Sequence, residues 1–174
     1  MKIHRSKSIN APVEDVWRVL ADHYADVGKR ARAVESSSPN ENAPTVNGSE
    51  VGGRVCQTSI GPATEILTHF DAANHHLKYK AHAEKMPFFV RALYGDWKLS
   101  SLGETTKVDF GFEADLSFPF SILMPPLKKI QFKKPIEETL DDLKTLMETG
   151  RTHPDKGETE LDAILNFAGR ARPN

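Results

Sequence analysis

Apolar and polar residues alternate with a period of two in three segments of the chain: 77–83, 93–101 and 107–115. The clearest alternation places four apolar residues on one face: Val108, Phe110, Phe112 and Ala114. A period of two is typical of β-strands that bury one face, and short connections between such strands favour antiparallel pairing. Further candidate strands are found at residues 2–10, 31–38, 52–60 and 63–71. The pattern therefore predicts an antiparallel sheet of about six or seven strands.

Two short helices are expected directly after the first strand. Pro12 suits the first position of a helix, where its missing N–H costs little. Apolar residues then recur at helical spacing: Val13, Val16, Trp17 and Leu20. A continuation or a second helix is expected near Tyr24–Arg30, and residues 39–50, rich in Pro, Asn and Gly, are expected to form a loop.

The last long element is predicted to be a helix with one apolar stripe: Phe132, Ile136, Leu140, Leu143 and Met147. Three earlier apolar residues project on roughly the opposite side of the same helix: Leu123, Leu127 and Ile130. An interior proline removes one hydrogen bond and costs about 3 kcal/mol. The sequence therefore leaves two alternatives, a kink at Pro135 or a short helix followed by a second helix that begins there. Gly150 is placed to end the helix.

Length and composition predict one folded domain, because the chain has 174 residues, of which 39% are hydrophobic and 27% charged. Residues 1–150 are predicted to form this domain. Residues 151–174 are predicted to be a polar tail. Within the tail, residues 159–168 have the spacing of a short amphipathic helix, which would need a tertiary contact to be ordered.

Charge and cysteine usage narrow the partners and the compartment. The net charge is −1, so no overall field would attract nucleic acid, and no such partner is expected. Cys56 is the single cysteine, which excludes an intrachain disulfide and fits a reducing compartment, so we expect a cytoplasmic protein. No apolar stretch approaches the roughly twenty residues of a membrane-spanning helix.

Several short motifs follow one another in order over residues 2–149: Ile9-Asn10-Ala11-Pro12-Val13-Glu14-Asp15-Val16-Trp17, Val51-Gly52-Gly53-Arg54, Glu65 with Phe70-Asp71, Leu77-x-Tyr79, and Trp97-x-Leu99 ahead of Thr105-Thr106-Lys107-Val108. Their order and spacing resemble the START-like helix-grip superfamily (SRPBCC), which includes polyketide cyclases and aromatases, pollen-allergen-type ligand carriers and coenzyme Q-binding proteins. The resemblance implies an α+β fold in which a curved antiparallel sheet grips the C-terminal helix around a cavity. Pro135 and the tail after Gly150 depart from the family pattern.

The resemblance also makes the inward apolar face a candidate ligand wall. The residues expected there are Phe70, Tyr79, Trp97, Phe110, Phe112, Ile136, Leu140 and Leu143. Such a stripe is equally typical of a packed core, and both interpretations stay open. Tyr79 and Trp97 carry polar groups that need partners when buried, and we expect both rings on the concave side of the sheet.

Two charged residues are candidates for chemistry or ligand anchoring. Glu65 could act as a general acid or base if it were buried. Strict alternation, however, places Glu65 opposite the face that carries Ile66 and Phe70, so we expect it to face solvent. Arg54 could anchor a carboxylate or phenolate, although its place beside Gly52-Gly53 favours a surface arginine.

The sequence predicts neither a metal nor a cofactor. Four histidines occur close together in the sequence, but their spacing matches no zinc site: His69, His75, His76 and His82. Cys56 is expected to be a small buried residue. The chain has no phosphate-binding glycine loop and no nucleophile elbow.

A basic run follows an apolar segment before the last helix. The run comprises Lys128, Lys129, Lys133 and Lys134, and the apolar residues are Phe118, Phe120, Ile122, Leu123 and Met124. This pairing is typical of peripheral membrane contact. A solvated helix face is the commoner explanation of such lysines.

Three functions remain open at this point. The first is binding of a small hydrophobic molecule of lipid, polyketide or aromatic type, as a carrier or sensor, by a monomer or homodimer. The second is a cyclase, aromatase or dehydratase acting on a polyketide-like substrate in the same cavity. The third is an interaction protein whose interior is filled by its own side chains. Convergent ionisable groups in the cavity would favour the enzyme, and a cavity with one polar end would favour the carrier. The lack of a cavity would favour the interaction protein.

Overall fold

The computed structural model describes residues 1–58, 61–123 and 125–156, and its centre is one seven-stranded antiparallel sheet. The strands are β1 (Lys2–Ile9), β2 (Val34–Pro39), β3 (Gly53–Thr58), β4 (Gly61–Asp71), β5 (His76–Ala83), β6 (Val90–Leu102) and β7 (Thr105–Leu116). Their order in the sheet is β1-β7-β6-β5-β4-β3-β2, so the first strand pairs with the last and the others form a meander. The predicted antiparallel sheet is confirmed.

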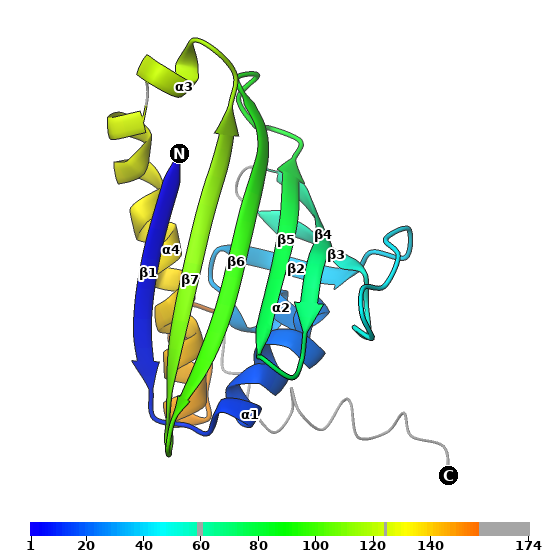
Figure 1. Cartoon of the computed structure of the whole chain (residues 1–174), viewed down its shortest axis with the longest axis vertical. Coiled ribbons are helices and arrows are strands. Elements are labelled where there is room, and N and C mark those ends of the chain that lie inside the picture. The colour runs from blue at the N-terminus through cyan, green and yellow to red at the C-terminus, as the bar shows by residue number, and fades with distance from the viewer. Residues whose placement is uncertain (59–60, 124, 157–174) are drawn as a thin grey trace.

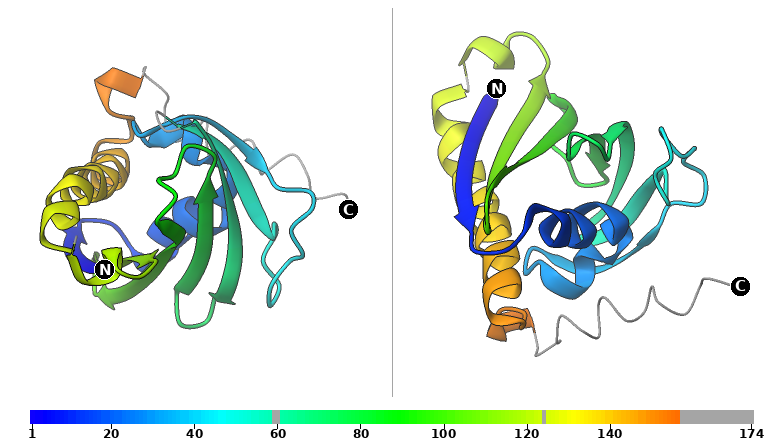
Figure 2. Two further views of the ribbon diagram at one scale, coloured as in Figure 1. Left: turned by 90° about the horizontal axis from the view of Figure 1, so that it is seen from above. Right: turned by 60° about the horizontal axis from the view of Figure 1, so that its bottom comes forward.

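Short helical turns connect β1 to β2, and a long helix follows β7. The connection contains α1 (Val13–Trp17), the π-helical turn η1 (Arg18–Asp22), the 3₁₀ turn η2 (Tyr24–Asp26) and α2 (Val27–Arg30), and the C-terminal part contains α3 (Phe120–Leu123), α4 (Pro125–Thr149) and the 3₁₀ turn η3 (Pro154–Lys156). The sheet curves around α4, which lies on its concave side, and α1 and α2 close one end (Figures 1 and 2). The helix-grip arrangement is therefore confirmed.

The main hydrophobic core lies between the concave face of the sheet and the helices. Trp97 and Phe110 stack there with ring centroids 4.1 Å apart, and both are buried together with Leu140 and Leu143 of α4. Tyr79 packs against the same cluster. The expectation that Trp97 and Tyr79 point to the concave side is confirmed.

Two cations of β1 explain why this strand is not simply alternating. Arg5 and Lys7 face inward with Ile9, but each meets an acidic residue on the side of α4. Arg5 Nε donates to Glu137 Oε1 at 3.2 Å, and Lys7 pairs with Asp141. These paired charges bind the edge strand to the helix without placing an unpaired charge in the core.

Helix α4 continues through Pro135, so the alternative of a second helix beginning at that residue is wrong. The Thr139 hydroxyl donates to the Pro135 carbonyl at 2.9 Å. After Thr149 the helix ends as predicted, because Gly150 adopts a positive φ of 70° and its N–H donates to the Leu146 carbonyl at 2.9 Å.

A β-bulge in β4 reverses one expectation. Leu67 pairs with Tyr79 and His69 pairs with Lys78, so Thr68 is an extra residue between them. Because the extra residue shifts the alternation by one, Leu67 and Phe70 both face inward. Glu65 consequently lies on the concave side, and the expectation that it faces solvent is wrong.

Residues that follow α4 fold back onto the start of β2. The Lys156 ammonium group donates to the carbonyls of Val34 and Glu35, and Arg32 contacts His153 at 3.2 Å. The predicted tail helix at 159–168 lies outside the described residues. Within the described part of the chain, no helix has the length and apolar character needed to cross a membrane.

Candidate functional site

A cavity of about 160 Å³ lies between the sheet, α2 and the middle of α4. Most of its wall is apolar: Leu20, Val27, Ala31, Val34, Trp97, Phe110, Phe112, Pro135 and Ile136. Its polar lining comes from Tyr24, Arg30, Arg54, Glu65, Tyr79 and Thr139. Pro135 is exposed while Ile136 is buried, so the cavity approaches the surface beside the middle of α4.

A buried ion pair forms the centre of the polar lining. Arg54 Nη2 donates to Glu65 Oε2 at 2.7 Å, and the Tyr24 hydroxyl donates to the same oxygen at 2.6 Å. Arg54 Nη1 also donates to the Tyr24 carbonyl at 2.7 Å, and its guanidinium lies 4.0 Å from the Tyr24 ring centroid. Arg54 is only 6% exposed, so the expectation of a surface arginine is wrong.

Local backbone packing brings these two strands together. Gly53 pairs with Ile66, and a Cβ atom at Gly53 would lie 2.1 Å from the Glu65 carbonyl oxygen. Only glycine allows β4 to approach so closely at this point. The next residue pair in the register is Arg54 and Glu65, which places the two side chains opposite each other on the concave face.

The two tyrosines at this end stay neutral over the physiological range. Burial raises the pKa of Tyr24 well above its ordinary value, and the nearby Glu65 carboxylate adds to the effect. Burial likewise raises the pKa of Tyr79, again with a contribution from Glu65. Both phenols can therefore donate hydrogen bonds, and neither is a base at neutral pH.

Arg30 is a second buried guanidinium in the lining, and helix α2 positions it. Val27, Arg30 and Ala31 lie three and four residues apart, so they share the buried side of α2, while Lys29 pairs with Asp26 on the other side. Gly28 holds α2 against β2, because its N–H donates to Ser37 Oγ at 2.7 Å. Burial lowers the pKa of Arg30 to about 10, so it is still charged at neutral pH.

The structure separates the eight candidate wall residues into two groups. Tyr79, Trp97, Phe110, Phe112 and Ile136 line the cavity. The other three belong to the packed core away from the cavity: Phe70, Leu140 and Leu143. Phe70 packs against Trp17 with ring centroids 5.5 Å apart.

Sequence reasoning missed Tyr24 and Arg30 as lining residues. A signal for both was present, because Leu20, Tyr24, Val27 and Ala31 recur at spacings of four, three and four residues. Arg30, three residues after Val27, is on the edge of that apolar stripe. A charged residue on the buried side of a helix is the feature that could have identified it.

The histidines do not converge on one site. His69 and His76 lie side by side with ring centroids 4.7 Å apart, His75 contacts Glu14, and His82 is exposed. Among the described residues, no group of three His, Cys, Asp or Glu side chains could hold a metal ion. Cys56 is buried as expected, and burial raises its pKa to about 11.

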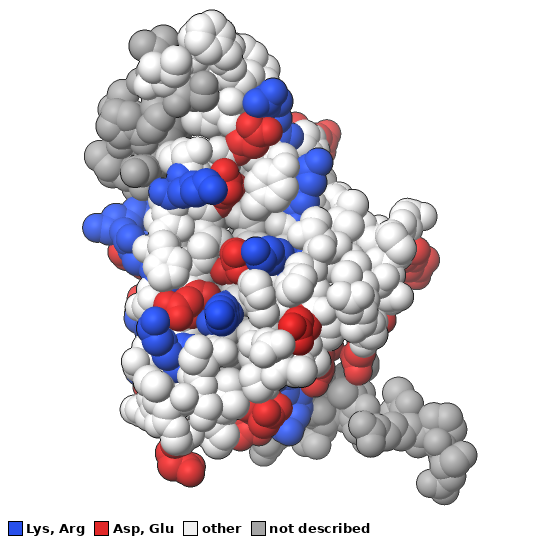
Figure 3. All heavy atoms as spheres, in the orientation of Figure 1, with Lys and Arg blue, Asp and Glu red and all other residues white. Residues whose placement is uncertain are grey.

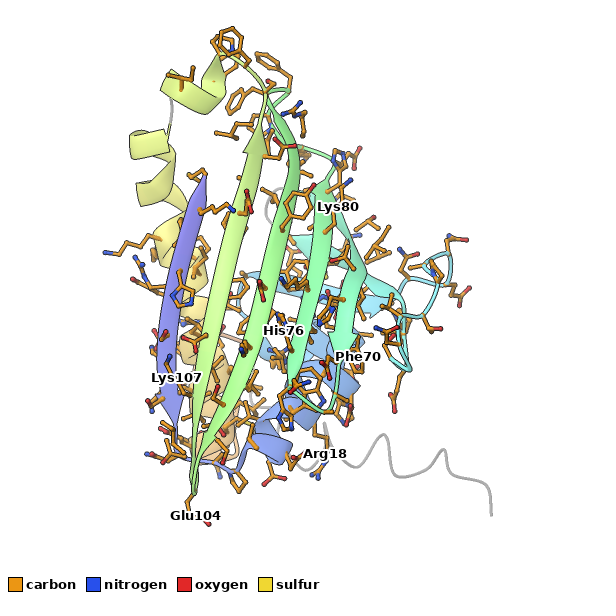
Figure 4. The ribbon with its side chains drawn as sticks, in the orientation of Figure 1. Arg18, Phe70, His76, Lys80, Glu104 and Lys107 are labelled. Atoms are coloured by element: carbon orange, nitrogen blue, oxygen red, sulfur yellow. The ribbon has the colours of Figure 1, made fainter. Side chains whose placement is uncertain are left out.

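A larger groove of about 460 Å³ crosses the opposite, convex face of the sheet. Its charged residues pair with one another at the surface, as in the Lys2–Glu113 pair at 3.2 Å and the Lys78–Asp96 pair at 3.1 Å. Positively and negatively charged side chains are interspersed over this face (Figure 3). Figure 4 shows the same face with its side chains as sticks and labels His76 on it. The groove is therefore a solvated, charge-paired surface, and the cavity beneath α4 is the better candidate site.

One end of the molecule exposes large apolar side chains. Phe88, before β6, is 86% exposed, and Phe118 and Ile122, around α3, are 79% and 71% exposed. The rings of Phe89 and Phe120 stack with centroids 4.8 Å apart, and both lie edge-on to the Phe88 ring. We call these residues the aromatic tip. In Figure 1 it lies at the top, at the end opposite the β6–β7 turn.

Comparison with known proteins agrees with this architecture. A family model described as polyketide cyclase / dehydrase and lipid transport matches residues 1–148. No curated protein matches the chain. A START superfamily protein from Mycobacterium smegmatis has a TM-score of 0.66 at 11% identity, over 85% of this chain and 97% of that chain.

Two further solved structures are similar. An uncharacterised protein from Bacillus thuringiensis has a TM-score of 0.66 at 15% identity, over 84% of this chain and 98% of that chain. Ara h 8.0201 has a TM-score of 0.62 at 11% identity, over 84% and 97% of the two chains. At these identities the likeness to solved structures concerns the fold alone.

Proposed function

Because the chain belongs to the polyketide cyclase/dehydrase and lipid transport family, we propose that it binds a small molecule with a hydrophobic body in the cavity beneath α4. The protein then acts as a carrier or sensor of that molecule, as a monomer or homodimer. Its single, buried cysteine fits a reducing compartment, and the cytoplasm is the location we propose. Residues 1–150 form the binding domain in this proposal, with 151–174 as a tail.

The observation that carries the proposal is the division of the cavity into an apolar wall and one polar end. Aromatic rings such as Trp97 and Phe110 offer a ligand the kind of surface that small-molecule sites use. Because Glu65 is already bonded to both Arg54 and Tyr24, the polar end serves better for fixing a ligand than for moving protons. We propose Tyr79, Trp97, Phe110, Phe112 and Ile136 as the ligand-contacting residues.

A cyclase or dehydratase is the second candidate, and one observation favours it. Ionisable groups from η2, β3 and β4 meet at the cavity, and the short Tyr24–Glu65 hydrogen bond could pass a proton to a bound substrate. Against this, a general base needs a free acceptor, and the Glu65 oxygen that faces Tyr24 also accepts from Arg54. The carrier is therefore the function that we favour.

Native mass spectrometry of protein purified without denaturation tests the binding proposal. We expect a non-covalent adduct of a few hundred daltons that is lost on denaturation. A neutral fluorescent probe, N-phenyl-1-naphthylamine, should bind the ligand-free protein and be displaced by the extracted molecule. An unchanged extracted molecule argues for the carrier, and its conversion during incubation argues for the enzyme. The absence of both an adduct and probe binding would contradict both functions.

We also propose that the aromatic tip touches membranes when ligand is loaded or released. Exposed aromatic and aliphatic side chains insert into the interfacial region of a bilayer, and nearby cations favour anionic lipids. Lys133 and Lys134, in the first half of α4, are exposed and supply such cations, and Lys134 also pairs with Glu138 at 3.7 Å. A patch of this kind is unusual on a surface that meets only water.

A further inference from the structure

Arg30 is a buried cation whose Nε has no acceptor among the described residues. It is 2% exposed and lines the cavity. Arg54 Nε, in the same lining, is also buried without an acceptor. A buried polar group that lacks a partner costs free energy. Two such donors at one cavity therefore favour a bound molecule that carries a hydrogen-bond acceptor.

The neighbouring carboxylates are already engaged. Glu65 accepts from Arg54 and from Tyr24. Asp142, on the buried side of α4, accepts from the backbone N–H of Arg32 at 2.8 Å and from Arg32 Nε at 2.7 Å. Each carboxylate therefore balances one arginine, and Arg30 is left over.

The local charge is consequently positive by one unit. Arg30 and Arg54 contribute two positive charges and Glu65 one negative charge, while Arg32 and Asp142 cancel each other. A charge buried in a region of low polarity is stabilised far better by an opposite charge than by dipoles alone. Among the described residues, Glu65 and Asp142 are close enough to favour the Arg30 charge, but neither makes an ion pair or hydrogen bond with it.

Building on the binding function proposed above, we infer that Arg30 is an anion subsite and that the ligand is a small hydrophobic monoanion. Its carboxylate, or a comparably acidic oxygen, pairs with Arg30 at the polar end. Its aromatic or alkyl body lies against Trp97 and Phe110. A guanidinium presents its N–H groups in a planar fork that suits a carboxylate, and Arg54 Nε provides a further donor.

The experiment compares two probes of the same shape that differ in charge, 2-naphthoate and 2-naphthamide. Each displaces N-phenyl-1-naphthylamine from the full-length protein at neutral pH. We expect 2-naphthoate to bind at least tenfold more tightly than 2-naphthamide. Arg30→Gln should abolish this preference, because the glutamine amide carries no positive charge. Arg30→Lys, which keeps the charge, should retain part of the preference.

Arg91→Gln is the matched control, because Arg91 pairs with Asp115 at the surface and lies outside the cavity lining. This variant should behave as the wild type. Equal affinity of the wild type for the two probes would overturn the anion subsite, and this result does not depend on whether the Arg30 variants fold. A folded Arg30→Gln variant that still prefers 2-naphthoate as strongly as the wild type would overturn it too. Binding of the neutral probe without a charge preference would leave the proposed function standing, whereas binding of no probe would contradict both.

Discussion

Gly95 of β6 lies directly opposite Tyr79 of β5, and a Cβ atom at Gly95 would come within 2.2 Å of the tyrosine ring. The ring therefore lies over the backbone of its neighbouring strand, in the space that a side chain would occupy. Tyr79 is also part of the cavity lining. The missing side chain of Gly95 is thus what gives the phenol its place at the cavity.

Gly95→Ala should displace the Tyr79 ring and reshape the cavity. We expect a loss of stability of about 1–3 kcal/mol from the overpacked contact, measured by denaturant unfolding, together with weaker binding of N-phenyl-1-naphthylamine. Gly103→Ala is a suitable control for glycine replacement, because a Cβ there would meet no described atom within 4 Å beyond its own chain neighbours. Its positive φ of 76° would cost some stability, but probe binding should not change. Unchanged probe binding in Gly95→Ala would contradict the role given to this pair.

The sheet and the long helix could be predicted from the sequence because each buries one face with a regular period. The inward residues of β5 and β7 occupy every second position, and the stripe of α4 recurs every three or four residues. Such periodicity directly reflects burial. It predicted the sides of Tyr79, Trp97 and Phe110 correctly.

The polar end of the cavity could not be predicted in the same way. The side of Glu65 depends on the extra residue Thr68, and no local feature of the sequence marks a β-bulge there. The burial of Arg54 depends on Glu65 lying opposite it in a neighbouring strand. Arg30 becomes a lining residue only through the packing of α2 against β2. Each of these placements is a tertiary effect, which one-dimensional patterns do not contain.

Glu65→Ala should strongly destabilise the protein, because it leaves Arg54 as well as Arg30 buried without a counter-charge. Breaking a buried ion pair by removing one partner costs about 3–5 kcal/mol. Glu137→Ala removes the carboxylate that pairs with Arg5 at the surface, and should cost less than about 1 kcal/mol. Urea unfolding of both variants gives the comparison. Similar losses of stability for the two variants would contradict the prediction that the buried Arg54–Glu65 pair contributes more than a surface pair.

Phe110→Ala and Leu140→Ala should differ in their effects, because Phe110 lines the cavity and Leu140 belongs to the core. Leu140 is buried in the core and does not line the cavity, so its truncation should cost about 2–5 kcal/mol with little effect on the affinity of N-phenyl-1-naphthylamine. Phe110 lines the cavity, so its truncation enlarges a space that already exists and should change probe affinity more than stability. Unfolding and probe titration on each variant test this. An effect on probe affinity in Leu140→Ala alone would reverse the assignment.

Cys56 should make stability fall as the pH rises above 9. Burial raises the pKa of its thiol from 9.0 to about 11, with a further contribution from Glu65 and an opposing one from Arg54. The unfolded chain therefore releases the thiol proton first. The stabilisation is complete below pH 9 and is lost as the pH rises from 9 towards 11, by about 3 kcal/mol in total.

The comparison of wild type with Cys56→Ala isolates this contribution from those of Tyr24 and Tyr79, whose pKa values are also raised. The free energy of unfolding should be measured for both proteins at several pH values between 8 and 11. The advantage of the wild type over Cys56→Ala should shrink across this range. A difference that stays constant would show that the thiol titrates alike in the folded and unfolded chains.

The aromatic tip should govern binding to membranes. Burying a large aromatic side chain is worth about 1.5–3 kcal/mol when complete, so replacing Phe88 and Phe118 together by alanine should weaken vesicle binding about tenfold or more. Co-sedimentation with vesicles of phosphatidylcholine and phosphatidylglycerol measures the effect. Leu102→Ala is the matched control, since Leu102 is 60% exposed but ends β6 at the opposite end of the sheet.

The double variant Lys133→Gln, Lys134→Gln should bind less strongly only to vesicles that contain the anionic lipid, because the contribution of these lysines is electrostatic. If the tip variant and Leu102→Ala lost vesicle binding equally, the binding would not depend on the aromatic tip. If the wild type did not bind vesicles, membrane contact by this surface would be excluded under these conditions.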